Sequence, residues 1–420
     1  MRKIIFALFA MNFALVLASD WSYSGMYAGS YLQRSNGIYA IGENPANIMN
    51  REKRNDFGFL MGLNFNAYNN SMSMNKLNNV SGKYLDEEDK EKFIGDLDGS
   101  LRAGASFSNQ MLACSRDNWG FSVSTFGKIK AKISKKYFDL IFFGNEYGEQ
   151  YLFTEKNNSL DAISYTDIAF AYQTDLQTMI PSLRENERMP TVRVGFAADV
   201  LIGLGTAETT AFKGVFDADE GGLDMKNEIH ITRAESGIGQ KFIIGFAVEP
   251  IENLSAGLVF DNIFGKITWN GNTEEDIFTV NSDSIYLAEI SEDFYTQTDT
   301  TSAIGNFSTS LPLIIKLGAL YQILPDWNAS IDFQKGMKNE SVWTDELKVS
   351  VATEYFIKEI IPLAMGFQNG TNDRPYRLSY GFGIRPEFMD LDFSVSSFGA
   401  FFPGNSVKGV GFNFNARWKF

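Results

Sequence analysis

The sequence contains one histidine, His230, and one cysteine, Cys114, so few residues are available for nucleophilic catalysis. A serine or cysteine hydrolase needs a histidine as general base and a further group that orients the imidazole. Nothing in the segment Glu228-Ile229-His230-Ile231 marks such an arrangement. We therefore expect that the protein is not an enzyme. Cys114 alone allows no internal disulfide, and we place it in a short turn between two strands, where its thiol is incidental.

An acidic segment around residue 217 imitates a calcium-binding loop. Asp217, Asp219 and Glu228 stand at its first, third and twelfth positions, and Gly222 stands at the sixth. Gly221 offers no side-chain ligand at the fifth position, and flanking helices are not evident. Our interpretation is an acidic surface turn, with the calcium site as the alternative. We expect no cofactor and no metal in the protein.

Charged residues also recur on the polar side of stretches that alternate between apolar and polar residues. If the apolar rows face outward, the interior receives Asp199, Asp261, Asp332, Lys348, Glu354, Arg377, Arg385, Asp390, Asp392 and Arg417. Five of these fall on three consecutive predicted strands: Arg377, Arg385, Asp390, Asp392 and Arg417. Opposite charges on neighbouring strands pair across a wall, so we expect an ionic network that holds a segment inside. The alternative is a polar route for an ionic solute.

The last dozen residues show the alternation most clearly. Apolar side chains at 410, 412, 414, 416, 418 and 420 are separated by small or polar ones. This period of two predicts a strand on which Phe412, Phe414 and Trp418 face lipid, while Asn413, Asn415 and Arg417 face the interior. A final strand that ends on an aromatic residue resembles the C-terminal signal of bacterial outer-membrane β-barrels. The resemblance implies that Phe412, Phe414, Trp418 and Phe420 are recognised by the barrel-assembly machinery.

Similar alternation recurs along the chain and predicts about fourteen strands, each long enough for a tilted crossing of a bilayer. The predicted strands cover residues 57–65, 101–107, 119–125, 163–172, 192–200, 242–248, 254–260, 313–321, 327–333, 347–355, 363–367, 376–384, 389–395 and 410–420. Most long connections fall at one end of these strands and most short turns at the other, as in outer-membrane barrels. The first long connection contains acids followed by lysines at residues 85–94, which predicts a short amphipathic helix. One predicted short turn covers residues 109–118 and includes Cys114.

Composition supports an all-β membrane protein rather than a helical one. The mean hydropathy is −0.15, and 37 Phe and 17 Tyr stand against 10 Pro. A net charge of −14 argues against nucleic acid as a partner.

The first residues have the features of an export signal. Arg2 and Lys3 precede an apolar run, and small residues end at Ala18, so cleavage before Ser19 is expected. We predict three parts: a signal peptide at residues 1–18, an N-terminal plug at 19–54 and an outer-membrane β-barrel at 55–420. The polar segment with Asn44, Pro45 and Ala46 precedes the first strand.

At this point the chain resembles the FadL-like outer-membrane proteins, which include long-chain fatty-acid transporters and PorV-like proteins of secretion. The resemblance rests on Asn44-Pro45-Ala46, Asp261-Asn262-Ile263-Phe264-Gly265, Leu311-Pro312, the run from Ile315 to Tyr321, Ala352-Thr353-Glu354-Tyr355 followed by Ile361-Pro362-Leu363, Gly381-Phe382-Gly383-Ile384-Arg385 and Asp390-Leu391-Asp392-Phe393. It implies a transmembrane antiparallel β-barrel of about fourteen strands, with the N-terminal segment folded into the lumen as a plug. The motif Asn44-Pro45-Ala46 belongs to that plug.

The resemblance also implies a function. We expect a passive, porin-like transporter of hydrophobic, fatty-acid-like small molecules in the outer membrane of a diderm, Gram-negative bacterium. The alternative is a non-transporting scaffold or secretion-associated protein, PorV-like, whose long acidic loops bind protein partners. The expected partners are outer-membrane lipid, the assembly machinery and a hydrophobic ligand. An apolar cavity that reaches a gap in the wall favours transport, whereas a filled lumen favours a scaffold.

Overall fold

The structure is a computed structural model that describes residues 24–49, 56–182, 190–219, 222–285 and 295–419. The predicted signal peptide and Phe420 lie outside these residues. Most of the described chain is β-strand, and its strands form one continuous antiparallel sheet.

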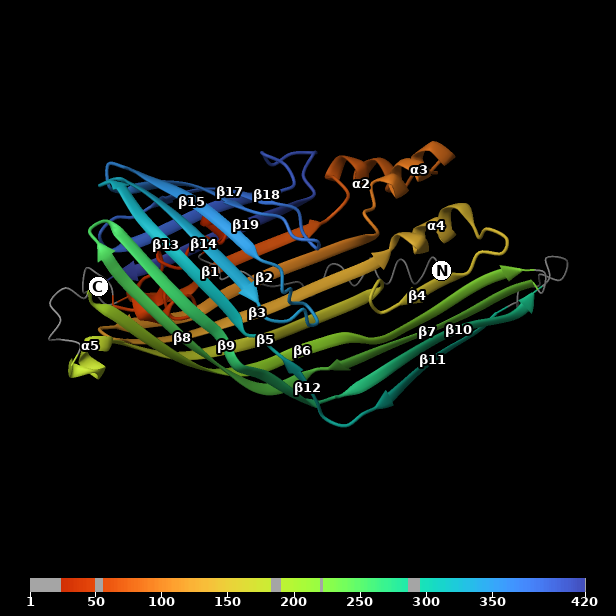
Figure 1. The fold of residues 1–420 in the computed structure, drawn as a ribbon, viewed down its shortest axis with the longest axis horizontal. Helices are drawn as coiled ribbons and strands as arrows, with labels where there is room; N and C mark the ends of the chain where they lie inside the picture. Colours follow the sequence, from red (N-terminus) through yellow and green to blue (C-terminus); the bar gives the residue numbers. More distant parts are fainter. Residues whose placement is uncertain (1–23, 50–55, 183–189, 220–221, 286–294, 420) are drawn as a thin grey trace.

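Fourteen of the described strands close a barrel, in which β1 pairs with both β2 and β19 (Figure 1). The barrel strands are β1 (Asp56–Asn69), β2 (Ser100–Arg116), β3 (Trp119–Ser134), β5 (Ser159–Asp175), β6 (Val192–Asp219), β8 (Ser236–Ile251), β9 (Leu254–Gly271), β13 (Ile314–Leu324), β14 (Trp327–Gly336), β15 (Lys348–Ile357), β16 (Ile361–Gln368), β17 (Arg377–Ile384), β18 (Met389–Phe398) and β19 (Gly409–Lys419). Each of the predicted strands corresponds to one of them, so the predicted all-β barrel is confirmed.

The two faces of the wall differ as the alternation requires. On β16, every second residue from Ile361 to Phe367 is exposed, and the residues between them are buried. The exposed set is apolar, whereas buried positions around the barrel carry many serines, asparagines and charged groups. Because successive side chains of a strand point to opposite faces, the outer surface is an apolar belt and the inner surface lines a polar lumen.

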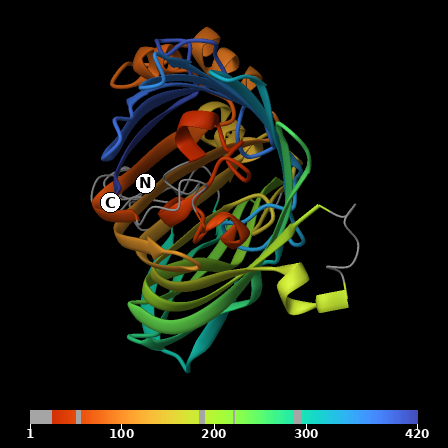
Figure 2. The ribbon, with the colours of Figure 1, turned by 90° about the vertical axis from the view of Figure 1, so that its left-hand side faces the viewer.

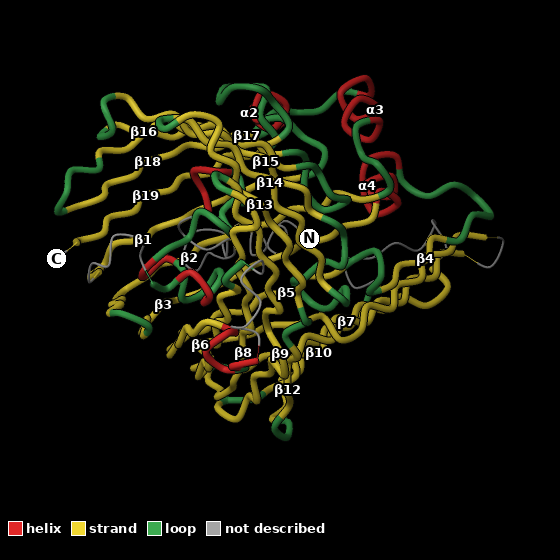
Figure 3. Tube along the Cα trace, turned by 60° about the vertical axis from the view of Figure 1, so that its left-hand side comes forward, coloured by secondary structure: helices red, strands yellow, loops and turns green. Residues whose placement is uncertain are grey.

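The two ends of the barrel also differ. Short turns join the strands at one end, which we call the turn end; α5 (Leu176–Met179) lies there. At the opposite end, the loop end, lie α2 (Met74–Val80), α3 (Glu87–Gly95) and α4 (Lys135–Phe143) (Figure 3). Helix α3 begins after Asp86, whose side chain accepts a hydrogen bond from Asp89 N, and it matches the predicted helix. Among the described residues, no helix is long and apolar enough to cross a membrane.

One predicted turn is wrong. Residues 109–116 continue β2, and the turn is reduced to Asp117 and Asn118, because β2 stays paired with β3 as far as Arg116 and Trp119. Cys114 therefore lies on β2, opposite Phe57 and Phe121, with an exposed side chain.

Two of the long connections are largely sheet rather than loop. Strands β6 and β9 continue past the barrel and pair with β4 (Tyr151–Thr154), β7 (Gly222–Ala234) and β12 (Phe307–Ser310). The sheet extends through β10 (Glu274–Ile285) to β11 (Thr296–Ala303). We call β4, the distal part of β6, β7, β10 and β11 the extension; it projects beyond the loop end (Figure 1).

The described N-terminal segment, residues 24–49, lies inside the ring of strands (Figure 2). Its short 3-10 helices η2 (Ser24–Tyr27), η3 (Gly37–Tyr39) and η4 (Pro45–Asn47) are buried throughout. Helix η2 packs against β15 to β19, η3 against β1 to β3, and η4 against β5, β6 and β8. The chain thus crosses the lumen as a plug, which agrees with the predicted fold.

Candidate functional site

A cavity of about 100 Å³ lies in the lumen between the plug and the wall. The plug contributes Leu32 and Glu43 to its lining. The wall and the β14–β15 loop add two kinds of surface: the aromatic side chains of Phe126, Tyr165 and Trp343, and a set of charged groups, most of them from β3, β8, β9, β13, β14 and β15. The lining is therefore amphipathic, rather than the purely apolar surface expected for a hydrophobic ligand.

The wall beside this cavity is bulged at Asp261-Asn262-Ile263-Phe264-Gly265 on β9. Asn262 and Phe264 have φ values of 61° and 54°, which non-glycine residues rarely adopt. The pairing of β8 with β9 shifts register across this stretch. Phe264 is 80% exposed, so the bulge presents an aromatic ring on the outer surface.

The bulge is also where β9 changes its partner on the other side. Asp261 pairs with Ile314 of β13, whereas Lys266 pairs with Ser310 of β12. Leu311 N donates to Gly265 O at 2.9 Å, and Asn262 Nδ2 donates to Pro312 O at 3.2 Å. The two sequence motifs Asp261–Gly265 and Leu311-Pro312 thus meet here, and irregular hydrogen bonds replace the regular ladder.

Directly inside the bulge, one buried lysine faces three buried aspartates. Lys241 Nζ lies 3.0 Å from Asp167 Oδ2, 3.3 Å from Asp199 Oδ2 and 3.8 Å from Asp261 Oδ1. Each of the four side chains is buried. Carboxylates so close together repel one another, so this cluster is short of positive charge.

A second lysine links the bulge to the plug. Lys316 Nζ on β13 is 3.3 Å from Asp261 Oδ2 and 3.2 Å from Glu43 Oε2 of the plug. Sequence reasoning placed Asp199 and Asp261 in the lumen but missed Lys241, Lys316, Asp167 and Glu43. Lys316 stands between the apolar residues of its predicted strand, and this inward parity was the signal that could have identified it.

On the opposite side of the lumen, two of the predicted network residues form a pair. Arg385 Nη2 is 3.1 Å from Asp392 Oδ1, and Arg385 Nη1 is 3.1 Å from Glu354 Oε1. Tyr27 of the plug donates to Glu354 Oε1 at 2.6 Å and accepts from Arg385 Nη2 at 2.9 Å. The network therefore includes the plug.

The two other arginines of the predicted network also reach the plug. Arg417 Nη1 is 3.8 Å from Asp390 Oδ2 and donates to Asn36 Oδ1 of the plug at 2.6 Å. Arg377 Nε donates to Ser396 Oγ at 3.1 Å, and its Nη2 donates to Gly25 O of the plug at 3.1 Å.

One plug residue that the sequence reasoning missed completes this side. Arg34 Nη1 is 3.1 Å from Glu354 Oε2, and both side chains are buried. Arg34 also donates from Nε to Ser330 Oγ at 2.9 Å. A buried arginine needs a carboxylate partner. The prediction that Glu354 faces inward could therefore have indicated that an arginine of the plug lies beside it.

The plug motif lies against the wall on the cavity side. Asn44 caps η4, because its Oδ1 accepts from Ala46 N at 3.1 Å, and its Nδ2 donates to Phe246 O of β8 at 3.3 Å. A Cβ atom on Gly195 of β6 would lie 2.0 Å from the carbonyl carbon of Pro45. Only a glycine at that position lets η4 approach so closely.

The closing strand has the predicted facing. Phe412 and Phe414 are exposed on the outer surface, and Trp418 is partly exposed. Asn413, Asn415 and Arg417 are buried, in part by the plug. Recognition of Phe412, Phe414, Trp418 and Phe420 by an assembly machinery stays a prediction, and Phe420 lies outside the described residues.

His230 and the calcium-like segment both lie in the extension. His230 Nδ1 is 2.9 Å from Glu275 Oε1, and Nε2 is 2.7 Å from Glu228 Oε1. The hydrogen bond to Glu275 and, secondarily, the one to Glu228 raise the pKa of His230 above its usual value. Both ring nitrogens are thus engaged by carboxylates, which leaves neither to activate a nucleophile.

The calcium-like residues do not converge. Asp217 faces Asp224 across the β6–β7 hairpin, whereas Glu228 faces Lys213 and accepts from its Nζ at 2.8 Å. This hairpin replaces the helix-flanked loop that the calcium motif requires. In the described part of the chain, no group of three or more histidine, cysteine or acidic side chains is arranged to hold a metal ion.

Comparison with known proteins identifies the fold. Residues 45–242 match the model of a family of unknown function, DUF5723. No curated protein matches the sequence. The toluene transporter TbuX of Ralstonia pickettii is 13% identical, with a TM-score of 0.51 over 96% of this chain and 98% of that one.

Two further solved structures agree. A Pseudomonas aeruginosa FadL homologue is 11% identical, with a TM-score of 0.50 over 97% of this chain and 99% of that one. The deltaS2S3 mutant of TodX, a monoaromatic hydrocarbon channel of Pseudomonas putida, is 11% identical, with a TM-score of 0.52 over 96% and 99%. At these identities the likeness shows the fold alone: this chain has the FadL-like barrel fold.

Proposed function

We propose that the protein is a passive outer-membrane transporter of small amphipathic molecules, fatty-acid-like in having an apolar tail. The observation that carries the proposal is the cavity between the plug and the bulged wall of β9. A ligand seated there touches the plug through Leu32 and Glu43 and the wall through Asp261 and Lys316. It is therefore placed where movement of the plug opens or closes a path.

The outer surface supports placement in a lipid bilayer. Its exposed apolar side chains recur on strand after strand, for example Leu317, Ile331, Leu363 and Phe414. Such a continuous apolar belt is costly in water and favourable in lipid. The predicted signal peptide is consistent with export to the outer membrane.

The lining favours an amphiphile over a hydrocarbon. Phe126, Tyr165 and Trp343 offer apolar surface, and burial of a ligand tail against such surface contributes about 25 cal/mol per Å². Lys241 and Lys316 line the same cavity, but aspartates and Glu43 already contact them. A polar head therefore finds hydrogen-bond partners, whereas a wholly apolar ligand leaves these buried groups uncompensated.

The plug is the moving part in this proposal. Helix η4 lies against β6 and β8, and Glu43, one residue before Asn44, is tied to Lys316. The cap made by Asn44 and the fixed φ of Pro45 hold this turn in place. Movement of this segment breaks no ion pair on the opposite side of the lumen, so the rest of the plug stays attached.

Uptake in liposomes tests the proposal. Purified protein is reconstituted, and binding and uptake of a labelled long-chain fatty acid are compared among wild type, Pro45→Ala and the control Pro403→Ala, whose proline lies in the exposed β18–β19 loop. We expect saturable uptake by wild type and the control, and altered uptake by Pro45→Ala with normal insertion. Absence of binding by wild type overturns the transport proposal, and unchanged uptake by Pro45→Ala discards the plug as the moving part.

A second candidate function is a scaffold for protein partners. The feature that favours it is the extension, which projects beyond the barrel and ends in β11, whose residues are all exposed (Figure 1). An exposed edge strand is a template for pairing with another chain. Barrels that insert normally but neither bind nor take up the fatty acid favour this candidate.

A further inference from the structure

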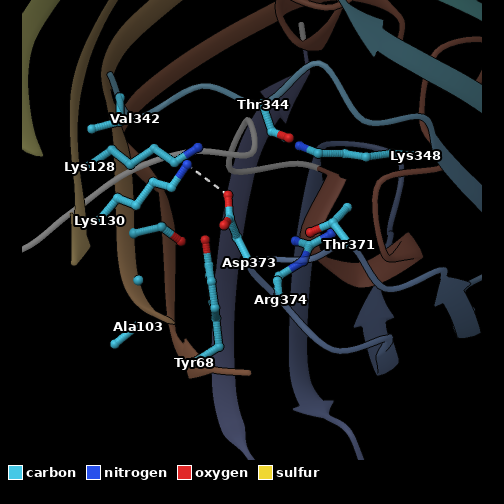
Figure 4. A pocket seen from close by; sticks show the side chains of 12 residues that line it. Tyr68, Ala103, Lys128, Lys130, Val342, Thr344, Lys348, Thr371, Asp373 and Arg374 are labelled. Carbon is cyan, nitrogen blue, oxygen red and sulfur yellow. Dashed lines mark ion pairs between the residues drawn. The ribbon is translucent and has the colours of Figure 1, made fainter. Parts of the chain in front are cut away.

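The lysines that point into the lumen differ in their access to solvent. At the loop end, Lys130 Nζ lies 2.8 Å from Asp373 Oδ2 beside a cavity of about 30 Å³ (Figure 4). The two side chains of this pair are 15% and 21% exposed, so solvent screens both charges. Lys241 is different, because its side chain is only 4% exposed and meets three carboxylates rather than one.

The strand register places Lys241 directly opposite one of these carboxylates. Asp199 of β6 and Lys241 of β8 are cross-strand partners in an antiparallel pair. Side chains of such partners share one face of the sheet, with Cβ atoms about 4.5–5.5 Å apart. Lys241 Nζ is 3.3 Å from Asp199 Oδ2 and 3.0 Å from Asp167 Oδ2 of β5. The amine therefore touches two carboxyl groups, one from β6 and one from β5.

The surroundings keep water away from this contact. Ala197 and Leu201 precede and follow Asp199 on the same face of β6, Ile243 follows Lys241 on β8, and all three are buried. The side chain of Asp199 is 0% exposed. Apart from the contact with Lys241, neither of its oxygens has a hydrogen-bond partner among the described residues. A further charge is costly there, so Asp199 is stable as the neutral acid.

This arrangement meets the requirements for joining an amine to a carboxylic acid. The carbonyl carbon must belong to a neutral acid, and a base must accept a proton from the amine. Asp167 is placed as that base, since its Oδ2 is closer to Lys241 Nζ than any other carboxyl oxygen. Its Oδ1 has no hydrogen-bond partner among the described residues. The fold holds the reacting groups together, so the condensation needs no cofactor and no oxidant.

From this geometry we infer that Lys241 and Asp199 join in an intramolecular isopeptide bond, with Asp167 as the proton acceptor. Lys241 Nζ gives one proton to Asp167 and forms a bond to Cγ of Asp199. The bond from Cγ to the hydroxyl oxygen breaks, and that hydroxyl leaves as water with a second proton from the nitrogen. The amide nitrogen keeps the third proton of the former ammonium, and Asp167 keeps the first. No atom is oxidised or reduced.

The bond lies beside the least regular part of the wall. Phe242, the residue after Lys241, pairs with Ile263 in the bulge of β9, and the register of β8 with β9 shifts on both sides of this pair. A covalent tie from β8 to β6 therefore supports β8 where its ladder to β9 is interrupted. The tie joins two wall strands and leaves the plug free, so it does not depend on the proposed transport function.

Intact-mass spectrometry of the purified chain, folded in detergent, tests the bond. We expect the folded wild type to be lighter than its calculated mass by one water molecule, and chain kept in denaturant to have the full mass. Protease digestion should then release a branched peptide in which Lys241 is joined to Asp199. The exposed pair of Lys130 and Asp373 is the internal control and should be recovered in linear peptides.

The most informative variant is Asp199→Asn, which forms the same bond with loss of ammonia instead of water. Its product should have the same mass as the wild-type product, although the two uncondensed chains differ. Asp167→Asn lacks the proton acceptor and Lys241→Arg lacks the nucleophile, so both should keep their full calculated mass. Lys266→Arg, at an exposed position of β9, is the matched control and should lose one water as the wild type does. Heat-modified gel migration establishes that each variant is folded before its mass is read.

The mass of the folded wild type is decisive, whether or not a variant folds. Its full calculated mass overturns the inference. Loss of water without a branched peptide also overturns it, because an aspartate can lose water by cyclising onto its own backbone. A branch through Asp167 or Asp261 overturns the assignment to Asp199, and loss of water by Asp167→Asn overturns the role of Asp167.

Discussion

The two sides of the lumen hold the plug in different ways. On the side formed by β15 to β19, each of the carboxylates Glu354, Asp390 and Asp392 is contacted by an arginine. On the side formed by β5 to β9 and β13, only two lysines, Lys241 and Lys316, contact four carboxylates, those of Asp167, Asp199, Asp261 and Glu43. The first side is electrostatically satisfied, and the second is not.

The strand pairing in the wall also differs between these two sides. Beside the satisfied side, β15 to β19 pair in unbroken register. Beside the unsatisfied side, β9 carries the bulge with two non-glycine residues at positive φ, and a cavity lies behind it. Strain and excess charge thus coincide with free volume, as expected where a structure has to move. In the proposed mechanism, the side formed by β15 to β19 anchors the plug, and the side formed by β5 to β9 and β13 permits its movement.

The strongest test of this comparison neutralises one carboxylate on each side. Glu354→Gln leaves the buried Arg34 and the half-buried Arg385 without their shared charge, so we expect a loss of about 3–5 kcal/mol of unfolding free energy. Asp199→Asn removes one of three crowded carboxylates, so we expect no loss or a small gain. Heat-modified gel migration and thermal unfolding in detergent measure both variants.

An exposed carboxylate provides the matched control. Glu252→Gln, in the β8–β9 turn, should change neither the heat-modified gel migration nor the thermal unfolding, because Glu252 is exposed. If Asp199→Asn destabilises the barrel as much as Glu354→Gln does, the two sides are equivalent and the comparison fails.

The next test concerns the wall that both sides share. Phe414→Arg places a charge on the apolar belt and should cost about 2–4 kcal/mol if the residue lies near the middle of a bilayer. Phe414→Leu is the control and should be nearly neutral. Reversible folding into lipid vesicles in urea measures both, and a small effect of the arginine would show that the belt does not contact lipid.

Arginine at the neighbouring inward position is a poorer control than the sequence suggested. From the alternation alone, Asn415→Arg should cost less than Phe414→Arg. In the structure, Asn415 is buried and donates to Asn413, whose side chain lies against Gly25 of the plug. An arginine at 415 therefore crowds the plug, and its cost reports on packing rather than on lipid contact.

The sequence predicted the barrel well because the side chain of each wall residue can point only outward or into the lumen. Every crossing strand was found from its period of two, and Arg385, Asp392 and Arg417 were correctly placed inside. The same rule missed the strands of the extension, because β7 and β10 lie in connections that we expected to be long loops. It also treated residues 109–118 as a turn, although β2 continues through them.

The candidate site was harder to predict than the wall. Plug residues such as Arg34 and Glu43 lack periodicity, so nothing in the sequence shows which way they point. Lys316 had inward parity, but its contact with Glu43 joins residues 273 apart in the sequence. Strand register fixes wall neighbours, whereas a plug contact depends on the path of an irregular chain across the lumen.

A glycine substitution can disturb the movable side without changing any charge. Gly195→Ala places a methyl group 2.0 Å from the carbonyl carbon of Pro45, so η4 has to shift. We expect a loss of about 1–3 kcal/mol from overpacking, together with faster protease cleavage of the plug. Limited proteolysis of protein inserted in vesicles measures the second effect.

The matched control for this variant is Gly305→Ala, since no heavy atom lies within 4 Å of a Cβ atom at that position. Gly366→Ala probes the anchored side, where the new Cβ would lie 2.4 Å from the carbonyl carbon of Tyr27. Because ion pairs hold the plug there, Gly366→Ala should destabilise the barrel without exposing the plug to protease. Equal exposure by the two variants argues against one movable side.

The smallest expected effect is a pH dependence confined to the extension. The carboxylates of Glu275 and Glu228 raise the pKa of His230, so the folded extension binds a proton more tightly than the unfolded chain does. This stabilisation is complete below the unfolded pKa of about 6.5 and is lost as the pH rises through the higher folded pKa. Because His230 is near the surface, we expect less than about 1 kcal/mol, seen as lower protection of the β7 and β10 amides at high pH, with each exchange rate divided by the intrinsic rate at the same pH. His230→Gln should abolish the change. Proteolysis of the plug should stay constant over the same pH range, since His230 contacts neither side of the lumen; a parallel change would mean that the extension and the movable side are coupled through β6, which runs through both.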